Sequence, residues 1–211
     1  MEKEKHLRDV DLAAGTAALV VVDMENEFCK PEGKYYLGPG VEPVIQRTGE
    51  LLARCRGAGL PVVFVRSVRY PTDAEFTRFG MELFLIEGTN GPVIVPELKP
   101  RPGEPVVEKH SHDCFYRTEM DAVLQRMGIE SQTHRVIVTG VMSNICVYHA
   151  VLGFHVRDFY TILPLDCTIG SPHAEDFVIA QFSNFAYEYN VWLTTSQRIR
   201  LASGRRDPAT I

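Results

Sequence analysis

Short, uninterrupted apolar runs alternate along this chain with longer segments of helical patterning, and this alternation limits the possible folds more than any other feature. The apolar runs predict strands at about residues 18–24, 61–66, 105–109, 135–140, 157–164 and 190–194. The helical patterns predict helices at about residues 42–58, 117–128, 143–154 and 173–187. Strands rich in β-branched residues without polar alternation are typical of a parallel sheet that is buried on both faces. The sequence therefore predicts an α/β fold with helices on both sides of an open parallel sheet.

Length, charge and cysteine content limit the classes of protein. With 211 residues and 45% hydrophobic content the chain can bury a full core, and we expect a single domain over residues 1–211. A net charge of −5 argues against a nucleic-acid partner. Because we find neither a signal-peptide pattern nor a membrane-length apolar run, we expect a cytoplasmic protein without a membrane partner. The five cysteines are widely spaced and form no C-x-x-C pair, which argues against a disulfide framework.

Three reactive side chains follow the predicted strands. Asp23 ends the first strand, Lys109 ends the third, and Cys146 comes six residues after the fourth strand ends at Gly140. In parallel sheets the ligand crevice lies beyond the carboxyl ends of the strands, so a carboxylate, an amine and a thiol can meet there. In that crevice Asp23 would accept the thiol proton, Lys109 would hold the ion pair, and Cys146 would attack a carbonyl. Taken singly, Asp23 is better explained as a helix or turn cap and Lys109 as a solvated charge at the end of a strand; their joint placement at strand ends favours the catalytic interpretation.

Cys146 has a local reason to be reactive. Ser143 is a suitable N-cap, which would place Cys146 near the third position of a helix. Free N–H groups and the helix dipole favour an anion there, so we expect a lowered thiol pKa and a nucleophilic cysteine. The alternative is a cysteine that serves only as a small buried hydrophobic residue.

Three segments resemble the motifs of the isochorismatase-like cysteine hydrolases, in the order and spacing of that family. The matching segments are Val20-Val-Val-Asp23-Met-Glu-Asn-Glu-Phe28, Val107-Glu-Lys109 with Phe115-Tyr-Arg-Thr118, and Val138-Thr-Gly-Val-Met-Ser-Asn-Ile-Cys146-Val. The resemblance implies a three-layer α-β-α fold with a six-stranded parallel sheet. It also implies a catalytic triad of Asp23, Lys109 and Cys146, and a cis peptide bond between Val141 and Met142.

The resemblance further implies hydrolysis of a C–N bond without a cofactor. Cys146 would form a thioester-type intermediate, and the backbone N–H groups of Met142 and Cys146 would bind the oxyanion. Members of the family that cleave the vinyl ether of isochorismate often lack this cysteine, so its presence favours an amidohydrolase. Vinyl-ether hydrolysis and a non-catalytic binding protein on the same fold stay open as alternatives.

The expected substrate is a small carbamoyl or ureido compound or a monoamide, as in the N-carbamoylsarcosine, ureidoacrylate and biuret hydrolase branch. A nicotinamidase would carry an Asp-x-His pair after the second strand, and this chain has neither residue there. Arg69 instead offers donors for a carboxylate or a ureido carbonyl, with a surface salt bridge as the alternative. The resemblance places Asn26 and Phe28 beside the pocket floor. We also expect Val141 to bind substrate and either His110 or His112 to line the pocket next to Lys109, with His110 as the preferred candidate.

Three further expectations concern metal, assembly and the longest connection. His110, His112, Asp113 and Cys114 are too close in sequence to converge on one zinc ion, so we expect no metal site. The resemblance suggests a homodimer or homotetramer. Residues 67–104 form a long connection rich in proline, glycine and charge, and such connections are often lids over a substrate site.

Overall fold

The uninterrupted apolar runs form the strands of one parallel sheet. The computed structural model describes residues 7–202, so residues 1–6 and 203–211 of the expected domain lie outside the described part of the chain. The sheet contains β2 (Ala17–Val22), β3 (Val62–Ser67), β4 (Val106–Lys109), β5 (Arg135–Val141), β6 (Tyr160–Pro164), β7 (Thr168–Ile169) and β8 (Trp192–Thr194). Six of these strands follow the order β4-β3-β2-β5-β6-β8, with all neighbours parallel. The two-residue β7, which was not predicted, pairs with β5 as a seventh strand.

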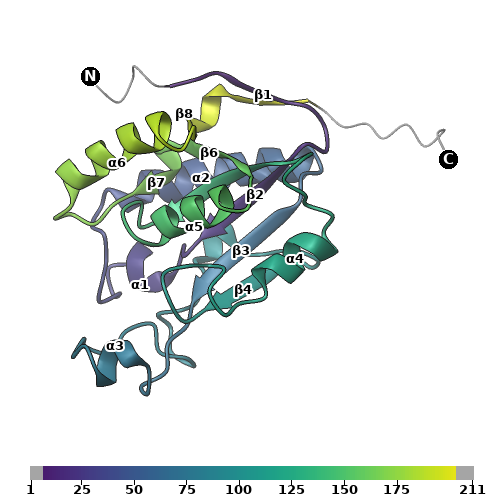
Figure 1. The fold of residues 1–211 in the computed structure, drawn as a ribbon. Helices are drawn as coiled ribbons and strands as arrows, with labels where there is room; N and C mark the ends of the chain where they lie inside the picture. Colours follow the sequence, from purple (N-terminus) through teal and green to yellow (C-terminus); the bar gives the residue numbers. More distant parts are fainter. Residues whose placement is uncertain (1–6, 203–211) are drawn as a thin grey trace.

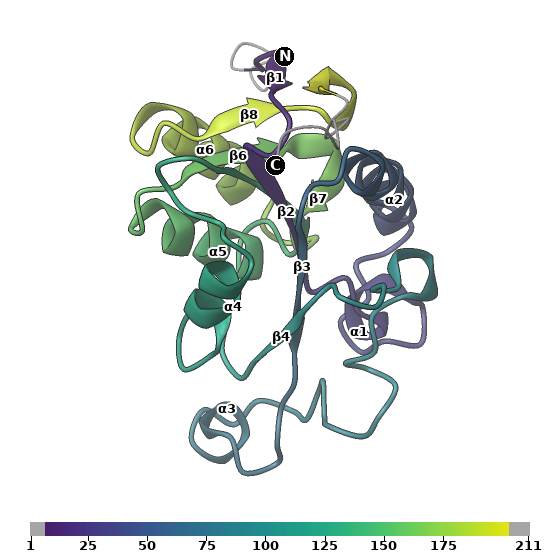
Figure 2. The ribbon, with the colours of Figure 1, turned by 90° about the vertical axis from the view of Figure 1, so that its right-hand side faces the viewer.

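Helices cover both faces of the sheet, which confirms the predicted three layers. On one face lie α1 (Asn26–Cys29) and α2 (Val41–Gly57), and on the other lie α4 (Met120–Arg126), α5 (Cys146–His155) and α6 (Glu175–Tyr187) (Figure 1, Figure 2). Leu19 and Val21 of β2 belong to the core on the α2 side, whereas Val20 and Val22 belong to the core on the α5 side. Both faces of β2 are buried, which explains why no polar residue interrupts it.

A second, two-stranded sheet brings together the two ends of the described chain. β1 (Val10–Leu12) pairs in parallel with β9 (Ile199–Leu201). The sequence does not predict this sheet, because strands of three residues are too short to show a periodic pattern. Among the helices of residues 7–202, none combines the length and the apolar content needed to cross a membrane.

The helix that carries Cys146 begins later than the sequence predicts. α5 starts at Cys146 rather than near residue 143, and Ser143 is not its N-cap. Instead, the backbone N–H of Ser143 donates to the carbonyl of Ile169 at 2.9 Å, and the Ser143 carbonyl accepts from Gln181 at 2.6 Å. Because Ser143 is held by β7 and α6, the chain turns before the helix and Cys146 takes the first helical position.

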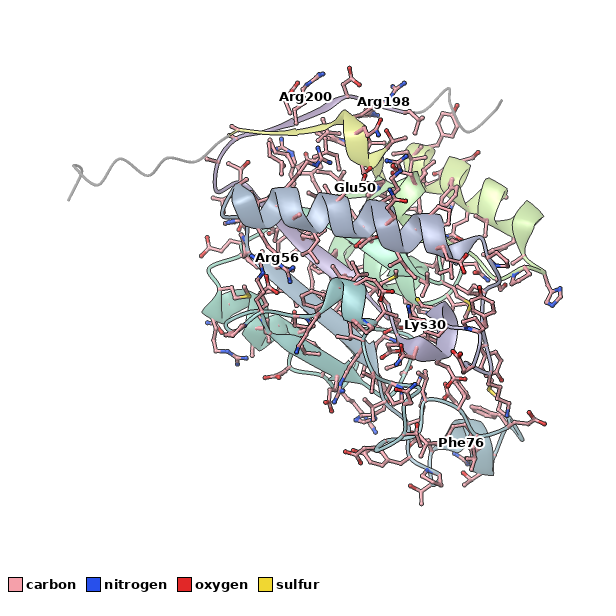
Figure 3. All side chains as sticks on the ribbon, turned by 180° about the vertical axis from the view of Figure 1, so that it is seen from behind. Lys30, Glu50, Arg56, Phe76, Arg198 and Arg200 are labelled. Carbon is pink, nitrogen blue, oxygen red and sulfur yellow. The ribbon has the colours of Figure 1, made fainter. Side chains whose placement is uncertain are left out.

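The long segment 67–104 projects beyond the carboxyl ends of β3 and β4. It contains α3 (Ala74–Thr77), which lies below the sheet in Figure 1, and a 3-10 helix, Pro96–Leu98. Figure 3 shows Phe76 in this projection, well separated from α2 and the labelled Glu50. The Phe76 ring lies 5.7 Å from the ring of Phe84, which lies 4.8 Å from that of Tyr35. These contacts hold the segment against the chain that follows α1.

Candidate active site

The three predicted reactive residues come from neighbouring strands at one edge of the sheet. Asp23 directly follows β2, Lys109 is the last residue of β4, and Cys146 begins α5 just after β5. The strand order β4-β3-β2-β5 brings these chain positions together. Asp23 and Lys109 are both fully buried, so neither is a surface cap or a solvated charge.

A hydrogen-bonded network joins the carboxylate, the ammonium and the thiol. Lys109 Nζ lies 2.8 Å from Asp23 Oδ2 and donates to Cys146 Sγ at 3.3 Å. Lys109 Nζ also donates to Ser67 Oγ at 2.6 Å, and Ser67 Oγ donates to Asp23 Oδ2 at 3.1 Å. Ser67 was not predicted, although it ends β3 directly opposite Lys109 in the strand register. The network can therefore pass a proton between the thiol and the carboxylate.

Burial shifts the pKa of the Cys146 thiol in the direction opposite to the predicted one. Burial raises the pKa of the Cys146 thiol above its ordinary value; the Lys109 ammonium acts to lower this pKa and Asp23 to raise it. The prediction of a lowered pKa from the helix terminus is therefore wrong, because desolvation outweighs the local dipole. Burial would lower the pKa of Lys109, but the Asp23 carboxylate raises it above its ordinary value. The resting site thus holds a neutral thiol beside a lysine–aspartate ion pair.

The backbone between β5 and α5 presents two free N–H groups beside Cys146. The peptide bond between Val141 and Met142 is cis, as the resemblance implied. Gly140 approaches β2 so closely that a Cβ would overlap the carbonyl oxygen of Val22. Within residues 7–202, no backbone carbonyl accepts a hydrogen bond from the N–H of Met142 or of Cys146. The turn thus leaves two donors free for an oxygen atom bound near the thiol.

A small cavity of about 100 Å³ opens onto the thiol. Its lining is mostly aromatic and aliphatic: Phe28, Tyr35, Ser67, Arg69, Met81, Phe84, Leu85, His112, Met142, Ile145 and Cys146. Four of these residues come from segment 67–104 in addition to Ser67 at its start, so this segment walls the cavity as a lid would. Phe28 and Arg69 lie where the sequence analysis expected them, beside the pocket. The other aromatic and aliphatic residues carry no chemical signature in the sequence.

Three of the expected substrate-binding residues lie elsewhere. The side chain of Asn26 donates to Asn90, at 3.1 Å to its carbonyl and 3.0 Å to Oδ1, and so anchors the projecting segment. Val141 is fully buried in the core behind the turn. His110 Nδ1 lies 2.8 Å from the Val68 carbonyl, on the wall of a neighbouring cavity that shares Met81 and His112 with the thiol cavity. The positions of these three side chains depend on tertiary contacts, which cannot be predicted from a sequence motif.

Of the two histidines expected at the pocket, His112 is the one that lies beside the Cys146 thiol. Its Nδ1 lies 3.8 Å from Cys146 Sγ, and its Nε2 lies 3.9 Å from Glu75 Oε1. Burial lowers the pKa of His112, and Lys109 lowers it further. His110 and His112 both line the larger cavity beside the thiol cavity. In the described part of the chain no three His, Cys, Asp or Glu side chains are grouped as a metal site.

Glu25 is a buried acid beside the network that the sequence analysis missed. Its side chain is fully buried, and among residues 7–202 neither carboxylate oxygen has a hydrogen-bond partner. Burial raises the pKa of Glu25 well above its ordinary value, the Asp23 carboxylate raises it further, and Lys109 opposes the shift. Glu25 therefore favours its neutral, protonated form.

We expect Glu25→Gln to stabilise the protein increasingly as the pH rises. Above about pH 4.3 the unfolded chain releases the Glu25 carboxyl proton, whereas the folded protein keeps it. The free energy of unfolding of the native protein therefore falls by up to about 1.4 kcal/mol per pH unit until Glu25 ionises in the folded state. Gln has nearly the same shape and does not titrate. Urea unfolding of both proteins between about pH 5 and pH 8 measures the difference. The control is Glu119→Gln, at a side chain that is 59% exposed, where the difference should stay constant with pH. A constant difference for Glu25→Gln would contradict the prediction.

A parallel α/β sheet with aspartate, lysine and cysteine side chains meeting at its carboxyl edge is an arrangement typical of a cysteine hydrolase. The family model described as "Isochorismatase domain" matches residues 17–198. The chain therefore belongs to the isochorismatase family, which confirms the resemblance and the expected hydrolase class.

Named relatives and solved structures agree with this family. Ureidoacrylate amidohydrolase RutB of Pseudomonas savastanoi pv. phaseolicola is 31% identical over 173 residues, covering 71% of this chain and 69% of the relative. RutB of Methylorubrum extorquens is 26% identical over 197 residues, covering 82% and 78%. The crystal structure of N-carbamoylsarcosine amidase from Thermoplasma acidophilum superposes with a TM-score of 0.73 at 29% identity, covering 86% of this chain and 96% of that one. Nicotinamidase PncA of Bacillus subtilis shares the fold, with a TM-score of 0.73 at 19% identity, covering 85% and 99%.

Proposed function

We propose that this protein is an amidohydrolase that cleaves a C–N bond of a small carbamoyl, ureido or monoamide compound, with Cys146 as the nucleophile. The observation that carries the proposal is the position of Lys109 Nζ, 2.8 Å from Asp23 Oδ2 and 3.3 Å from the Sγ of Cys146, a residue that lines the cavity. The similarity to a ureidoacrylate amidohydrolase and to an N-carbamoylsarcosine amidase supports the substrate class.

In the first step the thiol attacks the amide carbon. As the S–C bond forms, the thiol proton passes to Asp23, and the carbonyl π electrons move to the oxygen. The free N–H groups of Met142 and Cys146 are suited to bind this oxyanion. The raised thiol pKa suits this order, because the proton leaves only when a substrate is present to be attacked. Lys109 keeps its charge and stabilises the negative charge that develops beside it.

In the second step the tetrahedral intermediate collapses and the C–N bond breaks. The protonated Asp23 gives its proton to the leaving nitrogen, which departs as ammonia and leaves a thioester on Cys146. Water then loses a proton to Asp23 and attacks the thioester carbon. Cleavage of the C–S bond releases the acid, and the thiolate regains the proton from Asp23. Every proton in this cycle passes through one carboxylate, which Lys109 and Ser67 hold in place.

An ammonia-release screen tests the proposed function. The panel contains carbamoyl, ureido, biuret-like and monoamide compounds, each assayed with the native protein and with Cys146→Ala. We expect at least one compound to release ammonia only with the native protein. Vinyl-ether hydrolysis would instead survive Cys146→Ala, and a binding protein would release no ammonia from any compound that it binds. Either outcome would overturn the amidohydrolase proposal.

Two further expectations stay predictions. The homodimer or homotetramer suggested by the resemblance can be measured by light scattering of the purified protein. The cytoplasmic location can be tested by fractionating cells that express the full chain.

A further inference from the structure

The charge on Arg69 is already matched by the protein. The Arg69 side chain is 1% exposed, and its Nε donates to Glu75 Oε2 at 2.6 Å. Its Nη1 donates to the carbonyls of Val68 at 3.3 Å and Lys109 at 3.1 Å. In the described part of the chain Nη2 donates no hydrogen bond. Arg69 can therefore still donate to a neutral carbonyl oxygen, but its positive charge is already neutralised.

Neither the described cavity lining nor the network behind Cys146 supplies another free positive charge. Lys109 is paired with Asp23 at 2.8 Å. His112 has a lowered pKa and is therefore neutral at pH 7. Within residues 7–202, the rest of the cavity lining is aromatic, aliphatic or uncharged. A substrate carboxylate would thus enter an apolar cavity in which each cation already has its own anion, and burial of an unpaired charge is unfavourable.

Glu75 stands where such a carboxylate would bind. It lies on α3, in the projecting segment, and its side chain is 16% exposed. One of its oxygens pairs with Arg69 and the other faces His112 at 3.9 Å. A carboxylate that approached Arg69 would meet the negative charge of Glu75 at short range and would have to displace it.

We propose that Glu75 makes this site select amides and ureas whose remaining part is uncharged, by occupying the place on Arg69 that a substrate carboxylate would need. The inference rests on the proposed amidohydrolase function and specifies its substrate class. Among carbamoyl, ureido and monoamide compounds, it favours those in which a second neutral carbonyl or an apolar group faces Arg69 and Phe84. It disfavours carboxylates, including the ureidoacrylate and N-carbamoylsarcosine for which the relatives are named. Glu75 is then a specificity-determining residue that the protein supplies from its lid.

Matched pairs of compounds test this selection. Butyramide ends in a methyl group where succinamate ends in a carboxylate. Propylurea and 3-ureidopropionate differ in the same way. We expect the native protein to hydrolyse the neutral member of a pair with a kcat/KM roughly tenfold or more above that of the anion. Glu75→Gln keeps the shape and removes the charge, so it should shift this ratio toward the anion by roughly 10- to 100-fold, mainly through KM.

Two variants separate specificity from structure. Glu82→Gln makes the same charge change in the same segment, but Glu82 pairs with Lys34 and is 79% exposed, so the ratio should not change. Glu75→Asp keeps the charge and should keep the neutral preference. A native protein that hydrolyses the anions as efficiently as the neutral compounds would overturn the inference. So would an unchanged ratio in Glu75→Gln.

Binding keeps the inference testable without turnover. Calorimetry with the same four compounds and Cys146→Ala measures affinity in the absence of chemistry. We expect the neutral members to bind more tightly than the anions, and we expect Glu75→Gln to remove this difference. That result would support the selection even if no compound released ammonia. In that case only the proposed amidohydrolase function would fail. Equal or tighter binding of the anions would overturn the selection while leaving the amidohydrolase intact. Absence of both binding and turnover would overturn both.

Discussion

Replacing Cys146 with alanine is expected to lower kcat by about 10³-fold or more while leaving substrate affinity nearly unchanged. The thiol supplies the bond that replaces the C–N bond, and no other cysteine lines the described cavity. Alanine removes one sulfur atom from a wall that ten other residues also form, so the binding surface is largely kept.

Steady-state ammonia release and calorimetric binding measure the two parts of this prediction. The matched control is Cys55→Ala, which removes a fully buried thiol from α2 on the opposite face of the sheet. This control should keep kcat, although it loses some stability through the cavity it creates. Native-like kcat in Cys146→Ala would rule out the covalent mechanism.

Replacing Lys109 with methionine is expected to abolish activity and to lower the free energy of unfolding by about 3–5 kcal/mol. Lys109 and Asp23 are both fully buried and lie 2.8 Å apart. Loss of the ammonium leaves the Asp23 carboxylate buried without a counter-ion, and this uncompensated charge dominates the cost. Combining Lys109→Met with Asp23→Asn removes both charges and should restore most of the stability, but none of the activity.

Urea unfolding and ammonia release across this double-mutant cycle separate the two effects. The control is Lys30→Met, because Lys30 pairs with Glu97 at 2.6 Å on the surface beside α1 (Figure 3), where an ion pair contributes at most about 1 kcal/mol. Two results would contradict the prediction: a stability loss at Lys109 no larger than at Lys30, or activity in the double variant.

The main strands and the chain positions of the triad were predictable from local patterns. Buried parallel strands appear in the sequence as uninterrupted apolar runs, and β2 is buried at every position. Residues that end such strands face the ligand crevice, which is why Asp23 and Lys109 could be singled out. The pairing of β1 with β9 was not predictable, since it joins three-residue segments from opposite ends of the described chain.

The start of α5 and the thiol pKa show where local reasoning failed. Ser143 has the chemistry of an N-cap, but its backbone bonds to Ile169 and Gln181 instead. The dipole of a helix terminus is a local property, whereas burial of Cys146 depends on elements from the whole chain. Desolvation is the larger effect here, and it raises the thiol pKa.

The sequence by itself determined the α/β class, the family and the identities of Asp23, Lys109 and Cys146, because each is recorded in short-range pattern or motif order. Only the tertiary structure decided which side chains meet the thiol and how each one is charged. Ser67, His112 and Glu75 reach the site through strand register and through the packing of the projecting segment. The burial of Glu25 depends on neighbours distant in sequence, and the pairing of Arg69 with Glu75 depends on the conformation of the projecting segment. Charge state follows from desolvation and from partners within a few ångströms, and the folded chain alone sets both.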